Sequence, residues 1–346
     1  MKVKIVARMA WPSFRNTAIA IYNAVKTHHT CTIHDWKKVE PGGNILFIDT
    51  VHTPALKFLD KLLPESNVVF YGTTEGHSRL DEEAFAISKR VRIVAVSNFV
   101  KQMLEDIRVP VAGVLHHAIN MSDKKVDIEF YRKWKTKMRR RKVILTVSSN
   151  DPRKGLDKLL KAYKAVEERN EDSFLIVHSE PKKYCDLEGK VRSRYYDLEE
   201  EARNLKIKRL WLTNLFGRMS PPKLNALYKL CTAYVQPSLS EGFGLPILEA
   251  YRFDKPIIAV DAPPFNEVVS QTETGILVPS NGAYWFNYKD RIDFKMHTYA
   301  TEDLAQAILR CISDQRLLEK MQLKISQEKW GWDSRKRYPE LINYFT

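Results

Sequence analysis

Short apolar segments alternate with longer amphipathic segments along most of this chain. This alternation is typical of parallel β-strands joined by helices that cover both faces of a sheet. Strands are expected at residues 3–7, 30–34, 45–48, 68–71, 93–96 and 111–115, and again at 143–147, 174–178, 210–212, 233–236, 256–260 and 275–278. The two series predict an α/β protein with two doubly wound, Rossmann-like domains. A ligand would lie beyond the carboxyl ends of the strands, in the cleft between the domains.

The break between the two series of strands predicts the domain organisation. A chain of 346 residues is long enough for two domains. We expect an N-terminal domain over residues 1–120, a basic linker over 121–142 and a C-terminal domain over 143–325. A last helical segment, 326–346, could pack back on the N-terminal domain, and Pro339 should kink or end its helix. A helix is also expected at 187–205, and the aromatic stretch 281–299 fits neither period, so we expect an ordered excursion there.

Composition argues against several classes of protein. No apolar run reaches the roughly 18 residues that a transmembrane helix needs, and the first apolar segment is too short for a secretory leader. The four cysteines lie far apart and form no C-x-x-C pair, which indicates neither a zinc site nor a disulfide framework. These features predict a cytoplasmic protein.

The net charge of +14 suggests an anionic partner, and much of it comes from one segment. Eight of the twelve residues from 131 to 142 are basic: Arg132, Lys133, Lys135, Lys137, Arg139, Arg140, Arg141 and Lys142. On a helix, Phe130, Trp134 and Met138 would form an apolar stripe flanked by these cations. The helix could dock this stripe on its own domain, or residues 130–142 could lie on an anionic membrane at its cytoplasmic face. No nucleic-acid-binding motif accompanies the charge, so no nucleic acid partner is expected.

The segment 237–250 is the most informative part of the sequence for function. A predicted strand ends just before it, Gly242 and Gly244 flank an aromatic residue, and a helix should begin near Pro246. Glycines ahead of a helix leave backbone N–H groups free to face a ligand, and the helix dipole favours an anion there. Glu241 and Glu249 can point into the same pocket. Because a carboxylate accepts two hydrogen bonds from a vicinal diol, this pair suits a sugar and a ribose.

Glu241 and Glu249, separated by seven residues around Gly-Phe-Gly-Leu-Pro, resemble the E-x7-E signature of retaining glycosyltransferases of the GT-B fold, glycosyltransferase family 4. The family also has a strand similar to residues 144–147, followed by a K-G-x-D helix start similar to residues 151–157. Phe216-Gly217 resembles the segment that precedes the signature in that family. The resemblance is strong over about residues 140–280 and weak before them. This is expected if the second domain binds the donor and the first binds a variable acceptor.

The resemblance implies roles for the signature loop. Glu249 would bind the ribose hydroxyls of a nucleotide, and Glu241 would contact the hydroxyls of the donor sugar. Four residues of the loop would line the sugar and the diphosphate through their backbone: Gly242, Phe243, Gly244 and Leu245. The donor would be a nucleotide-diphosphate sugar, a UDP- or GDP-sugar, and the acceptor hydroxyl would belong to a glycan, a lipid-linked molecule or a protein. The chain would then be a hexosyltransferase-type enzyme.

Arg153 and Lys154 would neutralise the diphosphate as negative charge grows on it during departure. This is electrostatic stabilisation of a leaving group by fixed cations, which needs no metal. The chain contains no D-x-D sequence. We therefore expect a metal-independent transferase with no metal ligands and no cofactor.

The first domain offers two further candidates, Glu75 and His77, which follow a predicted strand and so should lie at the cleft. Either could orient the acceptor or polarise the transferred sugar. Two departures from the family weaken the prediction of activity. Ser149 stands where the family usually has an arginine, and the first loop, residues 8–15, lacks the usual glycines. The alternative is a non-catalytic protein of the same fold that binds a sugar nucleotide or a glycan.

Overall fold

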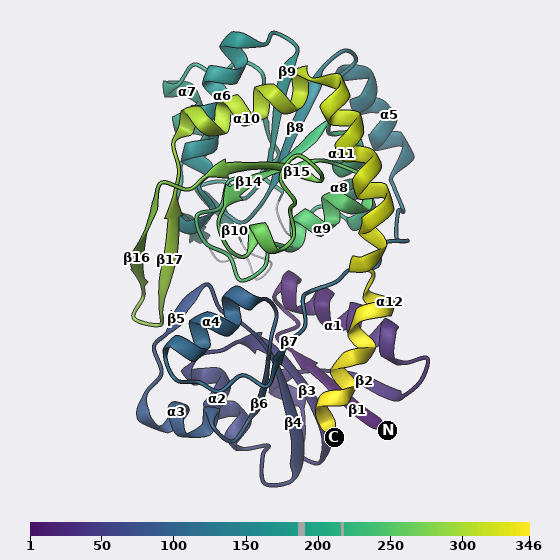
Figure 1. The fold of residues 1–346 in the computed structure, drawn as a ribbon, viewed down its shortest axis with the longest axis vertical. Coiled ribbons are helices and arrows are strands. Elements are labelled where there is room, and N and C mark those ends of the chain that lie inside the picture. Colours follow the sequence, from purple (N-terminus) through teal and green to yellow (C-terminus); the bar gives the residue numbers. More distant parts are fainter. Residues whose placement is uncertain (186–190, 216–217) are drawn as a thin grey trace.

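The computed structural model describes residues 1–185, 191–215 and 218–346. Two bodies, each built on a parallel sheet, lie one above the other, and both chain termini belong to the lower body (Figure 1). The first sheet has six strands in the order β2-β1-β3-β4-β6-β7, and the second has six in the order β12-β9-β8-β13-β14-β15. All pairings within these two sheets are parallel, which confirms the predicted fold class of two Rossmann-like domains.

The first body contains residues from both ends of the chain. Its strands are β1 (Lys2–Ala7), β2 (Thr30–Asp35), β3 (Gly43–Thr50), β4 (Ser66–Thr73), β5 (Gly76–Ser78), β6 (Arg92–Ala95) and β7 (Gly113–Val114). Its helices are α1 (Pro12–Val25), η1 (Trp36–Lys38), α2 (Thr53–Asp60), α3 (Glu82–Ser88) and α4 (Asn98–Asp106). Residues 45–49 of β3 are fully buried, because a central strand of a parallel sheet is covered on both faces.

The second body begins with helix α5 (Ile128–Lys137). Its strands are β8 (Lys142–Val147), β9 (Ser173–His178), β10 (Lys183–Cys185), β11 (Val191–Ser193), β12 (Leu210–Leu212), β13 (Ala233–Gln236), β14 (Ile257–Asp261), β15 (Gly275–Pro279), β16 (Gly282–Tyr288) and β17 (Ile292–Thr298). Its other helices are η2 (Pro152–Lys154), α6 (Leu156–Arg169), α7 (Leu198–Asn204), α8 (Pro221–Leu230), α9 (Leu245–Arg252), η3 (Phe265–Glu267), α10 (Thr301–Ser313) and α11 (Gln315–Glu328).

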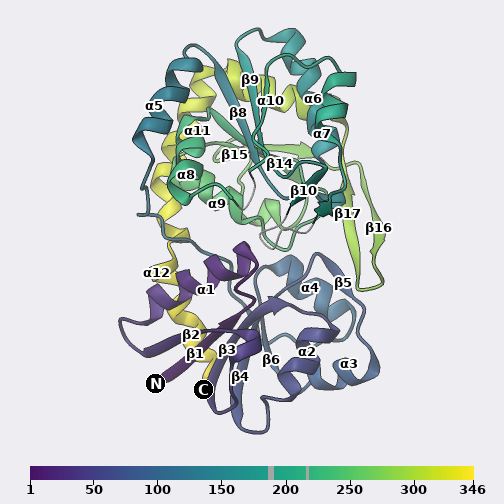
Figure 2. The same ribbon diagram turned by 180° about the vertical axis from the view of Figure 1, so that it is seen from behind.

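One expectation about local structure needs correction, and the excursion expected at 281–299 takes a definite form. The helix predicted at 187–205 begins only at Leu198, where the Asp197 side chain accepts a hydrogen bond from the N–H of Glu200 and caps α7. Before it, β10 and β11 pair as antiparallel strands, and residues 186–190 lie outside the described part. The aromatic stretch 281–299 is a β-hairpin, β16 and β17, whose second strand pairs with β5 of the first body. Both views show this hairpin reaching from the upper body to the lower (Figures 1 and 2).

The last segment of the chain returns to the first body. After α11 the chain passes through η4 (Lys329–Trp332), α12 (Ser334–Arg337) and η5 (Tyr338–Phe345), drawn in yellow in Figure 1. The Tyr338 hydroxyl donates to the carbonyl of Ala118 at 2.8 Å, and the Asn67 amide donates to the carbonyl of Phe345 at 2.9 Å. Pro339 stands at the start of η5, where its missing N–H does no harm. None of the helices described here is long and apolar enough to cross a membrane.

Helix α5 docks its aromatic stripe on the second sheet. The indole rings of Trp134 and Trp211 stack with centroids 3.7 Å apart, and Phe130 lies 6.4 Å from Trp211. Trp211 belongs to the edge strand β12, so the stripe covers that edge of the sheet. Met138 at the end of the helix is also buried. The structure therefore supports the docked-helix interpretation for the stripe itself, while the cations of α5 face outward.

Candidate functional site

The loop between β13 and α9 lies where the two bodies touch, and glycine permits the contact. A Cβ on Gly242 would stand 2.1 Å from the Thr73 hydroxyl oxygen at the end of β4, which no side chain tolerates. A Cβ on Gly155, whose φ is +60°, would stand 2.2 Å from the carbonyl oxygen of Pro237. Any larger residue at either position would push apart the elements that carry the predicted site.

Glu241 is almost fully buried, with 7% of its surface exposed, and polar groups surround its carboxylate. The Arg153 guanidinium donates to Oε2 at 2.8 Å, and the Lys154 ammonium donates to Oε1. The same Oε1 accepts from the Ser238 hydroxyl at 3.0 Å and from the Gln236 amide at 3.1 Å. Gln236 ends β13, so strand and loop together fix the acid. We call Glu241, Arg153 and Lys154 the Glu241 cluster.

Charge determines the ionisation state of this cluster. Burial alone would raise the pKa of Glu241, but Lys154 and Arg153 outweigh it and lower that pKa to about 2. Burial, together with the positive charge of Arg153, lowers the pKa of Lys154. The Glu241 carboxylate is therefore ionised at neutral pH and holds two cations in place.

The Glu241 cluster reaches across to the first body through Arg153. The guanidinium lies 3.1 Å from the carboxylate of Glu75, between β4 and β5. The Ser240 hydroxyl donates to the carbonyl of Glu75 at 2.7 Å. One candidate from the first domain, Glu75, thus joins the candidates of the second. The shared arginine places the site at the junction of the two bodies.

Glu249 lies one turn inside α9 and is half-buried. The Tyr228 hydroxyl donates to its carboxylate at 2.6 Å, and burial raises the pKa of Glu249. The ring of Tyr228 lies 5.8 Å from that of Tyr234, whose hydroxyl donates to Gln236, the residue that also contacts Glu241. The two acids of the signature are therefore linked through two tyrosines and one glutamine rather than by direct contact.

Backbone donors remain free beside the Glu241 cluster. Gly244 has a φ of +95° and precedes the first turn of α9, where Pro246 lacks an N–H. In the described parts of the chain, the N–H groups of Phe243 and Gly244 make no hydrogen bond. Free N–H groups at a helix start, near two cations, form an environment suited to an anion such as a diphosphate.

Known proteins resemble this arrangement in sequence. Residues 127–298 match the model of the family described as glycosyl transferases group 1. The second body therefore holds a glycosyltransferase domain. Within it lie Glu241, Arg153, Lys154 and Glu249.

Two curated relatives of that domain are named only as uncharacterized glycosyltransferases. One, from Sulfolobus islandicus rod-shaped virus 1, is 25% identical over 175 residues, which cover 50% of this chain and 52% of the relative. The other, from Methanocaldococcus jannaschii, is 24% identical over 74% of this chain and 62% of the relative. The chain thus spans roughly half to two thirds of the length of these two relatives.

Solved structures resemble the whole fold. A glycosyltransferase from Rickettsia africae has a TM-score of 0.73 at 17% identity and covers 99% of this chain and 97% of its own. Anabaena HepE, solved with UDP and glucose, has a TM-score of 0.72 at 14% identity and covers 99% and 98%. At these identities the likeness concerns the fold alone. That fold is the GT-B arrangement of two Rossmann-like domains.

His77 does not join the Glu241 cluster in this structure. Its ring stacks on Trp285 of β16 with centroids 4.2 Å apart, and its Nε2 lies 3.3 Å from Asp106 at the end of α4. Glu75 and His77 are two residues apart, so the sequence placed them together, but their side chains have different partners. The segment Phe216-Gly217, which contributed to the family resemblance, lies outside the described residues.

Sequence reasoning missed two polar groups near the domain junction. In the first, the Arg8 guanidinium lies 2.5 Å from the Asp49 carboxylate and 2.9 Å from Nε2 of His52, at the carboxyl ends of β1 and β3. In the second, Glu267 of the glycosyltransferase domain accepts from the N–H groups of Asn98 and Phe99, which begin α4, at 2.8 Å each. His116 also contacts Glu267 at 2.8 Å.

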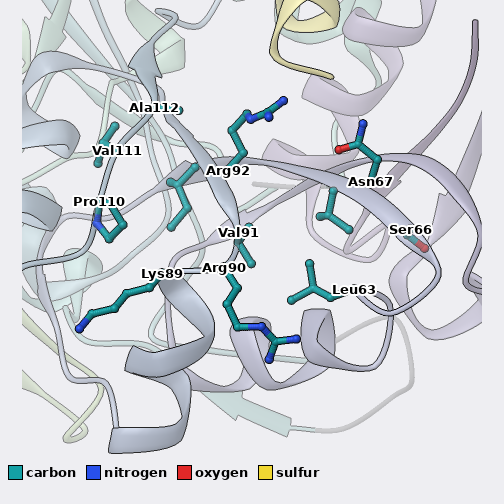
Figure 3. A pocket seen from close by; sticks show the side chains of 12 residues that line it. Leu63, Ser66, Asn67, Lys89, Arg90, Val91, Arg92, Pro110, Val111 and Ala112 are labelled. Carbon is teal, nitrogen blue, oxygen red and sulfur yellow. The ribbon is translucent and has the colours of Figure 1, made fainter. Parts of the chain in front are cut away.

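The pocket in Figure 3 is not part of this site. It has a volume of about 570 Å³ and lies at the amino ends of β4 and β6, the edge of the sheet opposite the domain junction. Its three cations, Lys89, Arg90 and Arg92, point away from one another (Figure 3). Arg90 is paired with Asp60 at 2.8 Å. Among the described residues, no three His, Cys, Asp or Glu side chains gather in a way that could hold a metal ion.

Proposed function

We propose that this protein is a retaining, metal-independent glycosyltransferase of family 4 that moves a sugar from a nucleotide-diphosphate sugar to an acceptor hydroxyl. The observation that carries the proposal is the Glu241 cluster. A buried carboxylate holds two cations beside free backbone N–H groups, inside a glycosyltransferase domain. The solved complexes of Anabaena HepE with UDP and with UDP-glucose support a donor of this class.

In the proposed reaction, the bond between the anomeric carbon and a phosphate oxygen breaks, the acceptor oxygen bonds to that carbon, and the proton of the acceptor hydroxyl passes to the departing phosphate oxygen. Negative charge grows on the departing diphosphate. Arg153 and Lys154 would offset this charge, and because Glu241 already holds them, little reorganisation is needed when it develops. The free N–H groups of Phe243 and Gly244 would add hydrogen bonds to the same oxygens.

The two acids would divide the binding of the donor. Glu241 has its carboxylate beside the cations, so its position suits hydroxyls of the transferred sugar. Glu249 lies one turn further along α9, where its half-buried carboxylate suits the ribose diol. Carboxylate–hydroxyl hydrogen bonds of this kind are charge-assisted and short, and they lose much of their strength when the acid is removed.

The proposed division can be tested with two variants. Glu249→Ala should weaken binding of a nucleoside diphosphate by about 1–3 kcal/mol, since it removes charge-assisted bonds to the ribose. Glu241→Ala should reduce transfer from the nucleotide sugar more than it reduces binding of the bare nucleotide. Calorimetry with UDP and GDP, beside a donor-consumption assay, gives both quantities.

Glu200→Ala, an exposed acid at the start of α7 with no ion pair among the described residues, is the matched control and should change neither quantity. Unchanged nucleotide affinity in Glu249→Ala would remove the ribose role. Tight nucleotide binding by the wild-type protein, with neither transfer nor donor hydrolysis, would favour the non-catalytic alternative.

A further inference from the structure

The basic residues of α5 and of the turn that follows it have no acidic partners among the described residues. Seven of the eight basic residues between 131 and 142 are exposed, and Lys142 is half-buried. In the described part of the chain none of the eight forms an ion pair. The acids nearest in sequence, Asp127 and Glu129, stand at the other end of the helix.

Part of this basic face is hollowed into a pocket of about 280 Å³. Its rim carries four cations: Lys135, Arg139, Arg140 and Arg141. Its remaining lining is apolar or aromatic: Tyr131, Met138, Val143 and Leu230. Met138 and Val143 are buried core residues, so this lining belongs to the packed body. No acidic side chain lines the pocket.

The rim is held in place by the fold. Arg140 adopts a φ of +70°, in the left-handed region that arginine rarely occupies, so the three consecutive arginines form a tight turn. The N–H of Arg141 donates to the carbonyl of Met138 at 2.8 Å, and its guanidinium donates to the carbonyl of Glu171. On the other side, Lys229 lies 4.9 Å from the centre of the Tyr131 ring and adds a cation beside the pocket.

Four cations around one small pocket repel each other, and none of the four is paired with a carboxylate among the described residues. A bound anion would relieve this repulsion. Guanidinium groups match the geometry of phosphate oxygens, and several around one group bind it with more hydrogen bonds than lysines would. The apolar lining beneath them would accommodate an organic substituent on the phosphate.

We propose that this pocket binds the phosphoryl group of an organic phosphate, at a site separate from the Glu241 cluster. The two sites lie at opposite ends of β8. The pocket includes residues at the amino end of the strand, and the Glu241 cluster lies beyond its carboxyl end. A strand of six residues is roughly 20 Å long. Figure 2 shows α5 on the outer side of the upper body, away from the hairpin.

The phosphate could belong to a soluble molecule or to a lipid headgroup, and the experiment separates these sources. Calorimetry with glycerol 3-phosphate tests the soluble source. Co-sedimentation with vesicles of equimolar phosphatidylcholine and phosphatidylglycerol, against phosphatidylcholine alone, tests the lipid source. We expect the wild-type protein to bind at least one of the two phosphate probes, and to bind it less at high salt.

The decisive variant replaces Arg139, Arg140 and Arg141 with glutamine. A basic residue near an anionic surface contributes about fivefold in affinity, so three replacements should weaken binding by about two orders of magnitude. The matched control replaces Lys2, Lys37 and Lys38, three exposed lysines of the first body, with glutamine and should bind as the wild type does. Lys135→Gln, with a smaller loss, serves if the triple variant does not fold, as its melting temperature will show.

Binding of glycerol 3-phosphate alone assigns the pocket to soluble organic phosphates, and binding of the mixed vesicles alone assigns it to lipid headgroups. Binding of neither probe overturns the proposal. An equal loss in the control variant also overturns it, because the effect would then come from overall charge rather than from the pocket.

Discussion

Two buried carboxylates stand on opposite sides of the domain junction, and their pKa values are shifted in opposite directions. Asp49 lies at the end of β3 in the first body and Glu241 lies just after β13 in the second, with 1% and 7% of their surfaces exposed. Each contacts an arginine. Yet the pKa of Asp49 is raised to about 6, and that of Glu241 is lowered to about 2.

The number of cations explains the difference. Burial raises the pKa of Asp49, and Arg8 together with the N–H of Thr50 offsets only part of that effect. Arg8 is also shared with His52, whose pKa burial and the charge of Arg8 lower to about 4. Glu241 has two cations, and they outweigh burial. Two positive neighbours thus lower the pKa of Glu241 despite its burial, whereas the single arginine beside Asp49 offsets burial only in part.

The largest expected effect on the rate of sugar transfer comes from removing Lys154, the second cation beside Glu241. Lys154→Ala should lower the rate of sugar transfer by about 100- to 1000-fold, the range seen when one preformed electrostatic donor is lost. In the described chain Arg8 makes no contact with the Glu241 cluster, so Arg8→Ala should lower the rate far less. Initial rates at saturating donor measure both.

Lys161→Ala, an exposed cation on α6, is the control and should leave the rate unchanged. Excess EDTA should also leave the wild-type rate unchanged. If Arg8→Ala and Lys154→Ala slow transfer equally, the cations beside Asp49 and Glu241 do not differ in the way proposed. If EDTA abolishes activity and manganese restores it, the transfer depends on a metal ion.

A second test uses pH. Because the folded pKa of Asp49 is about 6 and its ordinary value is 3.8, the free energy of unfolding should fall by about 3 kcal/mol as pH rises between these values. Asp49→Asn should remove that fall. The pKa of Glu241 is shifted the other way, so its contribution is present above pH 4.5 and is lost as pH falls towards about 2.

Urea unfolding at a series of pH values, with the wild-type protein, Asp49→Asn and Glu241→Gln, provides the measurement. The wild-type-minus-variant curves should slope in opposite directions in the two pH windows. Parallel curves would show that the two carboxylates have similar environments.

The smallest expected effect is on nucleotide affinity, and it comes from Glu75, the first-body residue that contacts the Glu241 cluster. Glu75 contacts Arg153, a cation proposed to bind the diphosphate, so it competes with that ligand. Glu75→Gln should tighten binding of a nucleoside diphosphate about fivefold, the value of a partly exposed ion pair of about 1 kcal/mol. Glu83→Gln, which breaks an exposed pair with Lys57, should have no effect in the same titration. Weaker binding by Glu75→Gln would mean that Glu75 supports the ligand site.

The fold was largely predictable, because the two parallel sheets leave a local signal. Buried strands are short apolar runs, and each strand of the two sheets falls at or near a predicted segment. The strands β5, β16 and β17 were missed. The pairing of β17 with β5 joins residues far apart in the sequence, and the exposed aromatic rings of Tyr284 and Trp285 in β16 hide the usual alternation.

The candidate site was predictable only in part. Glu241, Arg153 and Lys154 belong to two short segments with a recognisable pattern, and the structure brings them together. The contact of Glu75 with Arg153 and that of Glu267 with the start of α4 depend on how two bodies meet, which no local pattern encodes. For His77 the sequence was misleading in the other direction. Its position after a strand predicted a place in the site, but its ring packs on Trp285.

The shared sheet has a mechanical consequence. The chain crosses between the bodies at the segment before α5 and again near η4, and both crossings lie along one edge of the molecule (Figures 1 and 2). Two bodies joined along one edge can rotate relative to each other, with that edge as the hinge. Main-chain hydrogen bonds between β17 and β5 add a third attachment at the opposite edge. Rotation of one body away from the other about the first edge therefore requires these hydrogen bonds to break, together with the bonds of Glu267 to the start of α4.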